Sequence, residues 1–439
     1  MNDSAQVQTP ARAQAMTGLA LWLPLFLIVS LFFMWGVANN LNDILITQFK
    51  KAFVLSDFAS GWVQSAFYFG YFALAIPASL AMKCFGYKAA VITGLLLYGL
   101  GAGLFYPAAQ AQEYGYFLLA LFVIASGLAF LETSANPLIV AMGHPETAER
   151  RLNFAQSFNS LGTISGVLIG REFILSGVEP SPAALAAMTQ AERTAFYTAE
   201  VQAVAAPYVA IAAVVLLWAL AVWWVRFPTV VGGQEDTDHR FRLRDFKALF
   251  RRRYYLFGVA AQFFYVGAQV CIWSYMIRYG QAALPGAGEK TLADYLAASL
   301  VAFMIGRFVA TALMGRVAPA RLMLIYALAN IVLCAVAMLA PSRVGLVALA
   351  GTSFFMSLMF PTIFALSLRG LGALTKAGSA LLVMAIIGGA VITALMGLVS
   401  DLTAIHWAVG VPLVCFFVVA AFARRTLREG MAKSGKGSV

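Results

Sequence analysis

Uninterrupted apolar stretches of about 20 residues or more recur along nearly the whole chain. Each is long enough to cross a hydrocarbon core of about 30 Å as a helix that rises about 1.5 Å per residue. The composition agrees, because 62% of the 439 residues are hydrophobic and only 11% are charged, whereas a soluble domain carries about a quarter charged residues. The chain is therefore predicted to be an all-α membrane protein, and the composition excludes a soluble one.

The apolar stretches predict twelve transmembrane helices. The first stretch is too long for the core of a signal peptide and has no convincing small-residue cleavage site, so we expect it to be retained as helix 1. The predicted spans are 21–47, 58–82, 89–108, 115–142, 153–176, 206–228, 254–283, 291–315, 320–340, 342–368, 377–400 and 404–423.

The basic residues predict the orientation. The net charge of +11 could suggest a nucleic-acid partner, but the Lys and Arg side chains collect in alternate loops, as the positive-inside rule describes. If both termini are cytoplasmic, 22 of the 30 lie on the cytoplasmic side, seven lie on the other side, and Arg307 lies within a helix. We therefore expect a multi-pass protein of the bacterial inner membrane with both termini in the cytoplasm, lipid around it and no nucleic-acid partner.

A basic segment near the middle, HRFRLRDFKALFRRR, divides the apolar pattern into six helices plus six. The halves are weakly similar, which is typical of transporters built from repeated bundles: FFMWGVANN in helix 1 parallels FFYVGAQVC in helix 7, and ANPLIVA in helix 4 parallels FPTIFAL in helix 10. We predict an N-terminal tail over 1–20, six-helix bundles over 21–228 and 254–423, a cytoplasmic linker over 229–253 and a C-terminal tail over 424–439. Two pseudo-symmetric bundles resemble the major facilitator fold.

Two acidic residues lie within predicted spans, Asp43 in NNLND and Glu132 in FLETSANP. An ionised carboxylate in the membrane costs about 2.5 to 3.5 kcal/mol, so each is a functional candidate. Burial disfavours the charged form, which suits reversible proton binding, and both are candidate proton carriers. The alternatives are that Asp43 meets water near the outer end of helix 1 and that Glu132 is structural. Arg307 could be a counter-ion, a ligand contact, or a residue that snorkels toward the headgroups.

Uncharged polar residues recur at helical spacing on four helices. Each must find a partner away from lipid, so we expect these sides to face a shared cavity; the alternative is that the amides only bond neighbouring helices. Carboxamides and carboxylates can bond adjacent hydroxyls while Trp or Phe faces cover a sugar ring, so the pattern favours a polyhydroxylated ligand. The stripes are Trp35, Asn39, Asn42 and Asp43 with Asn40 beside them, Glu132 and Asn136, Asn153, Gln156 and Asn159, and Gln262, Tyr265, Gln269 and Trp273.

Long stretches of the chain resemble the fucose permease family, the L-fucose:proton symporters of the major facilitator superfamily. They include NNLNDIL (39–45), QSAFYFGYF (64–72), RLNFAQSFNS (151–160), QFFYVGAQ (262–269), WSYMIRY (273–279), IGRF (305–308) and FPTIF (360–364).

The resemblance implies a cavity between the bundles, protonatable carboxyls at Asp43 and Glu132, sugar contacts from Asn40 and Gln156, and aromatic walls from Trp35, Trp273 and Phe303. Where better-known members of the family have a Tyr in helix 10, this chain has Phe360, which removes a hydroxyl contact. We therefore expect proton-coupled uptake of a sugar, L-fucose first, with galactose, glucose or another hexose as alternatives.

Other classes of protein fit the sequence less well. An efflux antiporter would share the fold and the acids, but the amide stripes argue against apolar or cationic substrates. The three histidines lie in predicted loops or at a helix end, and neither GxSxG nor HExxH occurs, so we expect no enzyme. No P-loop and no paired-cysteine metal motif occurs, so we expect no cofactor and no metal. The expected partners are a sugar and a proton, and the expected state is a monomer.

Overall fold

The computed structural model describes residues 18–53, 62–142, 144–174, 187–225, 243–287 and 289–434. These residues form α-helices and short 3-10 turns, and no β-strand occurs among them. The apolar sequence accounts for this, because a backbone within lipid has to satisfy its own hydrogen bonds. The prediction of an all-α protein is confirmed.

The first half contains seven described α-helices, with one break inside the second. Gly86 has φ of 83°, a left-handed conformation that suits glycine, and its non-helical backbone separates helix α3 into two helices. The bounds are α1 (Gly18–Ala52), α3 (Trp62–Gly103), α4 (Phe105–Ala111), α5 (Tyr114–Ala141), α6 (Ala148–Phe173), α8 (Gln190–Gln202) and α9 (Ala205–Trp224).

Helix α8 was not predicted from the sequence. Its N-terminus is a capping box, in which the hydroxyl of Thr189 accepts from the Glu192 N–H and the Glu192 carboxylate accepts from the Thr189 N–H at 2.8 Å. It is less apolar than α9, and it extends the sixth crossing beyond the predicted span.

The second half begins with the short helix α10 and contains two interrupted crossings. Helix 10 is divided into α14 and α15, and helix 11 into α16 and α17 by a 3-10 turn over Ala385–Ile387. The bounds are α10 (Leu243–Phe250), α11 (Arg253–Ala283), α12 (Glu289–Leu313), α13 (Pro319–Leu339), α14 (Arg343–Met356), α15 (Met359–Leu368), α16 (Thr375–Met384), α17 (Gly388–Leu402), α18 (Ile405–Ala408) and α19 (Gly410–Ser434).

Among the described residues, 10 helical stretches are long and apolar enough to cross a membrane. One of them, Trp62–Ala111, contains two predicted spans, because it runs across the break at Gly86. The fifth predicted crossing corresponds to α6, whose polar side chains lower its hydropathy. These stretches agree with the twelve predicted crossings. The predicted tail and linker boundaries stay predictions, because 1–17, 226–242 and 435–439 lie outside the described residues.

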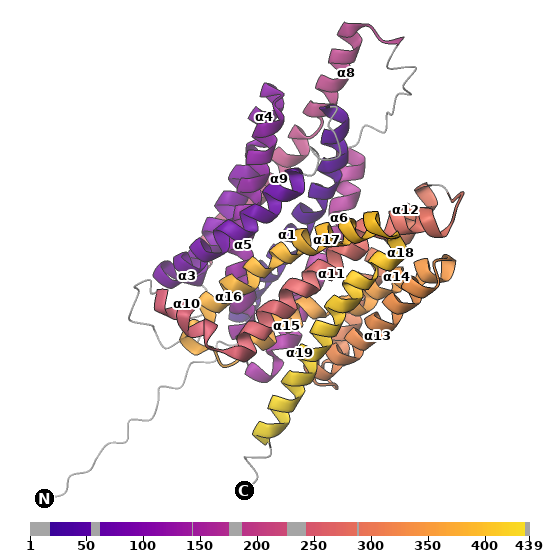
Figure 1. Cartoon of the computed structure of the whole chain (residues 1–439). Helices are drawn as coiled ribbons and strands as arrows, with labels where there is room; N and C mark the ends of the chain where they lie inside the picture. Colours follow the sequence, from indigo (N-terminus) through magenta and orange to yellow (C-terminus); the bar gives the residue numbers. More distant parts are fainter. Residues whose placement is uncertain are drawn as a thin grey trace, which may run out of the picture.

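The two halves form two groups of helices, indigo to magenta and orange to yellow in Figure 1. They meet where α3 packs against α16 and where α6 packs against α12 and α15. The contacts at the end of the molecule that carries α10 are polar: Arg369 forms an ion pair with the fully buried Glu149, Nε to Oε1, at 2.5 Å. One turn inward, the Nδ2 of Asn153 donates to the hydroxyl of Thr362 at 3.0 Å. These bonds join the halves at the α10 end.

Helices α1 and α6 pack closely because glycines face their contact. A Cβ at Gly36 would meet the backbone of Asn159, and a Cβ at Gly162 would meet the carbonyl oxygen of Phe33. Small residues of this kind let two membrane helices approach until their backbones touch. The approach fixes the position of α1, whose other residues reach the centre of the molecule.

Candidate functional site

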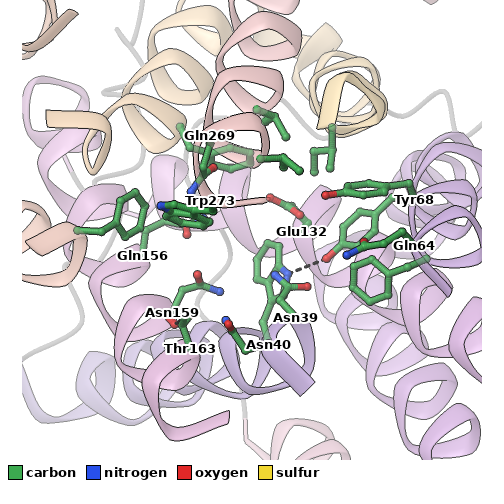
Figure 2. A pocket seen from close by; sticks show the side chains of 18 of the residues that line it. Asn39, Asn40, Gln64, Tyr68, Glu132, Gln156, Asn159, Thr163, Gln269 and Trp273 are labelled. Carbon is green, nitrogen blue, oxygen red and sulfur yellow. Dashed lines mark hydrogen bonds between the residues drawn. The ribbon is translucent and has the colours of Figure 1, made fainter. Parts of the chain in front are cut away.

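A central cavity of about 210 Å³ lies between the two halves. Its wall combines amides, aromatic rings, a carboxyl group and a guanidinium, and it is lined by α1, α3, α5 and α6 of the first half and by α11, α12 and α15 of the second. Figure 2 shows many of these side chains pointing into one space. The lining residues are Trp35, Asn39, Asn40, Gln64, Phe67, Tyr68, Tyr71, Glu132, Gln156, Asn159, Thr163, Val266, Gln269, Val270, Trp273, Ser274, Phe303, Arg307, Phe360 and Ile386.

Glu132 is the acidic residue of this wall. It lies on α5, where nearly all residues from Ile124 to Ile139 are buried, and its own side chain is 3% exposed. No ion pair involving Glu132 occurs in the described part of the chain. A carboxyl group held in a mainly apolar helix without a cation can stay neutral by binding a proton, and it bears an uncompensated charge when it loses that proton.

Aromatic side chains form fixed walls on both sides of the cavity. On the first half, the indole N–H of Trp35 donates to the Tyr71 hydroxyl at 2.7 Å. On the second half, the indole N–H of Trp273 donates to the Ser353 hydroxyl at 3.0 Å, and its ring meets Phe303 edge-on at 5.1 Å between centroids. Because these N–H groups are already bonded, the rings present their faces to a ligand rather than a donor.

The amides are held differently, and some retain free bonding capacity. The Nδ2 of Asn159 donates to the Phe32 carbonyl at 3.2 Å, and the Nε2 of Gln156 donates to Oδ1 of Asn136 at 3.1 Å. The side-chain oxygen of Asn39 is buried and has no hydrogen-bond partner among the described residues. Figure 2 shows Asn39 and Asn40 of α1 facing Gln156 and Asn159 of the neighbouring helix α6. Such groups can accept from and donate to the hydroxyls of a small molecule.

Arg307 does not snorkel toward the headgroups, so that alternative is wrong. Its side chain is 3% exposed, and it donates from Nε to the Ser357 carbonyl at 2.8 Å and from Nη1 to the Gln156 carbonyl at 2.7 Å. The guanidinium also lies 4.6 Å from the centroid of the Phe303 ring. These partners hold it at the cavity wall and join α12 to α6.

Three predicted ligand residues do not reach the cavity wall, so the expectation that their stripes face it throughout is corrected. Asn136 is fully buried and accepts from Gln156. Tyr265 is fully buried and donates to the Met356 carbonyl at 3.0 Å. Gln262 is also fully buried. Gln262 and Tyr265 lie nearer than Gln269 to the α10 end of α11. At that end the two halves are in contact and the cavity is closed.

The other predicted residues either line the cavity or have side chains that lie outside the described part of the structure. Ten line the cavity, and their roles in binding stay predictions: Trp35, Asn39, Asn40, Glu132, Gln156, Asn159, Gln269, Trp273, Phe303 and Phe360. The side chains of Asn42 and Asp43 lie outside the described ones, although their backbone belongs to α1. The proposed proton role of Asp43 therefore also stays a prediction.

Several polar residues of the cavity wall, chiefly on α3, were not predicted from the sequence. Gln64, Tyr68 and Tyr71 recur at intervals of three and four residues, which puts them on one face of a helix. That spacing lies within the family-like motif QSAFYFGYF and could have identified them. Thr163 and Ser274 gave no such signal, because a single hydroxyl in an apolar helix often bonds to its own backbone, as Thr163 does to the Asn159 carbonyl at 3.1 Å.

No group of three or more His, Cys, Asp or Glu side chains among the described residues could hold a metal ion. The chemistry that the wall offers is hydrogen bonding to a neutral polar ligand, stacking on its apolar face, and reversible protonation of one carboxyl group.

Two groups of membrane-crossing helices around a polar central cavity define a membrane transporter. The family model described as Major Facilitator Superfamily matches residues 24–392, and the chain belongs to that superfamily.

Comparisons with individual proteins confirm the predicted resemblance to fucose permeases. The chain is 46% identical over 408 residues to the L-fucose-proton symporter of Escherichia coli (strain K12), covering 92% of each sequence. It is 34% identical over 393 residues to the glucose/galactose transporter of Brucella abortus biovar 1 (strain 9-941), covering 89% of this chain and 91% of the relative. The crystal structure of the transporter FucP in the outward conformation matches with a TM-score of 0.86 and 45% identity, covering 93% of this chain and 99% of that one.

Proposed function

We propose that this protein takes up a neutral sugar, L-fucose first, together with protons, across the bacterial inner membrane. The observation that carries the proposal is the central cavity, in which the buried Glu132, which has no ion-pair partner among the described residues, shares a wall with amides and aromatic rings. The names of two relatives support it, one an L-fucose-proton symporter and the other a glucose/galactose transporter. Glucose and galactose are the second candidates, because Phe360 offers no hydroxyl to the ligand.

Sugar recognition follows from the chemistry of the wall. Asn39, Asn40, Gln156 and Gln269 bond the hydroxyls, while the faces of Trp35 and Trp273 cover the less polar side of the ring. Phe303 supports Trp273 from its edge. Asn136 acts behind the wall, because its bond orients the Gln156 amide.

Proton coupling follows from the burial of Glu132. An ionised carboxylate at mid-depth costs about 2.5 to 3.5 kcal/mol, so the cavity closes around the site more readily when Glu132 carries a proton. A proton that crosses a potential of 100 mV releases about 2.3 kcal/mol, and about 1.4 kcal/mol corresponds to tenfold. One proton per neutral sugar would then support about a fortyfold gradient before any pH term. Asp43 is the second candidate carrier.

Transport by alternating access requires a state closed on one side, and the polar contacts at the α10 end supply its closure. We assign the α10 end to the cytoplasm from the distribution of basic residues, with both termini on that side, and take residues 21–228 and 254–423 as the two rocking bundles. Opening that end would separate Arg369 from Glu149 and Asn153 from Thr362. We take the monomer as the working unit and assign the chain no enzymatic activity.

The proposal is tested by uptake of labelled L-fucose into proteoliposomes with an imposed inward proton gradient, with D-galactose and D-glucose as competitors. Accumulation that an uncoupler abolishes supports symport, and the competitors rank the sugars. Glu132→Gln should bind sugar but fail to accumulate it. If none of the three sugars accumulates in a preparation that binds one of them, symport is excluded. If efflux of a cationic substrate is driven instead, the antiporter is the correct class.

A further inference from the structure

A second cavity lies away from the central one, between α1 and α9, with a volume of about 520 Å³. We name it the lateral groove, and it opens between membrane-crossing helices rather than between the two halves of the protein. Side chains of α1, α3, α6 and α9 line it, among them Phe33, Met34, Val37, Tyr98, Ala210 and Val214.

The two ends of the contact between α1 and the sixth crossing are joined by hydrogen bonds. Toward the α10 end, the indole N–H of Trp218 donates to the Ser30 hydroxyl at 2.7 Å. Toward the other end, Nε2 of Gln48 donates to Oε2 of Glu200 at 2.7 Å and to its carbonyl oxygen at 2.9 Å. Ser30 and Gln48 are about 27 Å apart along α1 at 1.5 Å per residue. The groove lies between these two hydrogen-bonded points, because its lining residues on α1 and on the sixth crossing fall between them in the sequence.

The helices that border the groove are each held by another neighbour. Helix α1 is held against α6 through Gly36 and Gly162. Helix α9 packs on α3 and on α4, where Tyr208 stacks on Phe105 with ring centroids 3.7 Å apart. The side of α9 that faces the gap carries small residues, among them Ala210. The gap therefore results from the packing of the bundle, and no described residue of the chain fills it.

The lining determines the chemistry of that molecule. The described lining side chains are apolar except that of Tyr98, and the Tyr98 hydroxyl already donates to the Met34 carbonyl at 3.2 Å. Among the described lining residues no polar group is left to bond a sugar or a headgroup, and the helices on either side cross the membrane. We propose that the lateral groove binds one acyl chain of a bilayer lipid. This acyl chain lies in the leaflet opposite the α10 end, on the side where Phe173 and Ala203 line the groove.

The driving force for this binding is close contact rather than the hydrophobic effect, because a lipid tail in the bilayer is already in an apolar solvent. An empty gap leaves its lining atoms without van der Waals partners. The same helix α1 carries Trp35 and Asn39 on its other side, so a bound chain would support one wall of the central cavity.

The test is native mass spectrometry of the full-length protein extracted with its membrane lipids. Under detergent conditions that strip surface lipid, the wild type should retain one phospholipid per chain, and Ala210→Trp should lose at least four fifths of it. Leu217→Trp is the matched control, because Leu217 is on the same helix, is 64% exposed and does not line the groove. It should retain the phospholipid as the wild type does.

A second measurement does not depend on a variant that folds. Phosphatidylethanolamine with a diazirine in its acyl chain is photolysed in nanodiscs that contain the wild-type protein. Crosslinks should concentrate on α1 around 33–37 and on α9 around 207–215. Crosslinks spread evenly over the exposed surface of α9, equal lipid retention by Ala210→Trp and the wild type, or a dimer that covers the groove would each overturn the proposal. None of these outcomes depends on sugar transport.

Discussion

Replacement of Arg369 should favour opening of the α10 end. In Arg369→Ala the carboxylate of Glu149, which is 0% exposed, loses its ion-pair partner. Removing one partner of a fully buried pair costs about 3 to 5 kcal/mol. This pair is only half buried, because the Arg369 side chain is 50% exposed. The lower range of about 1.5 to 3 kcal/mol, typical of a hydrogen bond to a charged group, therefore applies. We therefore expect the closed state to lose about 2 kcal/mol, which is about a thirtyfold shift of the equilibrium toward opening at the α10 end.

The shift can be measured by double electron–electron resonance in nanodiscs. Spin labels are placed at Glu146 and Ala373, which are exposed on the two halves near this end, after the exposed Cys84 is replaced by alanine. Arg369→Ala should increase the population with a long label separation. Arg425→Ala is the control, because Arg425 pairs with Glu429 of the same helix, both side chains are more than two fifths exposed, and the substitution should leave the distances unchanged. Identical distance distributions for Arg369→Ala and the wild type would refute the role of the ion pair.

Three further substitutions test the site and the packing around it. Phe360→Tyr adds a hydroxyl to the cavity wall and should raise the preference for L-fucose over D-glucose about fivefold, or about 1 kcal/mol, in competition uptake; an unchanged ratio would exclude this contact. Tyr71→Phe leaves the Trp35 indole N–H without its acceptor and should weaken sugar binding about tenfold by calorimetry, whereas wild-type affinity would mean that Trp35 needs no such support. Gly162→Val places carbon against the backbone of α1 and should destabilise the fold by about 1 to 3 kcal/mol in thermal unfolding; Gly103→Ala, with open space around its Cβ, is the control, and equal melting of the two variants would contradict the close approach.

The fold could be predicted from the sequence because each crossing is long and apolar, and lipid permits a helix there. The breaks within the helices could not be predicted in this way. Helix 11 is divided at Ala385–Ile387, directly before Gly388. A Cβ added at Gly388 would meet the Phe263 carbonyl, and a contact of this kind depends on a residue that is far away in the sequence. Helix α8 was missed because it is polar and lies beyond the apolar run of α9.

The site was predictable where polar or aromatic residues recur on one helix face, as for Trp35 and Asn39 or for Gln156 and Asn159. Periodicity identifies a face but not the depth at which the cavity ends. Gln262 and Gln269 belong to one stripe of α11, yet only Gln269 lines the cavity. The position of Arg307 also escaped prediction, because its two carbonyl partners come from Ser357 and Gln156, which are distant in sequence.

The central claim is that proton and sugar move together through Glu132. The most direct measurement is sugar-induced proton flux: L-fucose is added outside proteoliposomes without an imposed gradient, and the external pH is recorded. The wild type should alkalinise the medium as sugar enters, and Glu132→Gln should give no pH change while it still exchanges labelled for unlabelled sugar. Sugar entry without a pH change in the wild type, or proton flux that persists in Glu132→Gln, would contradict coupling through Glu132.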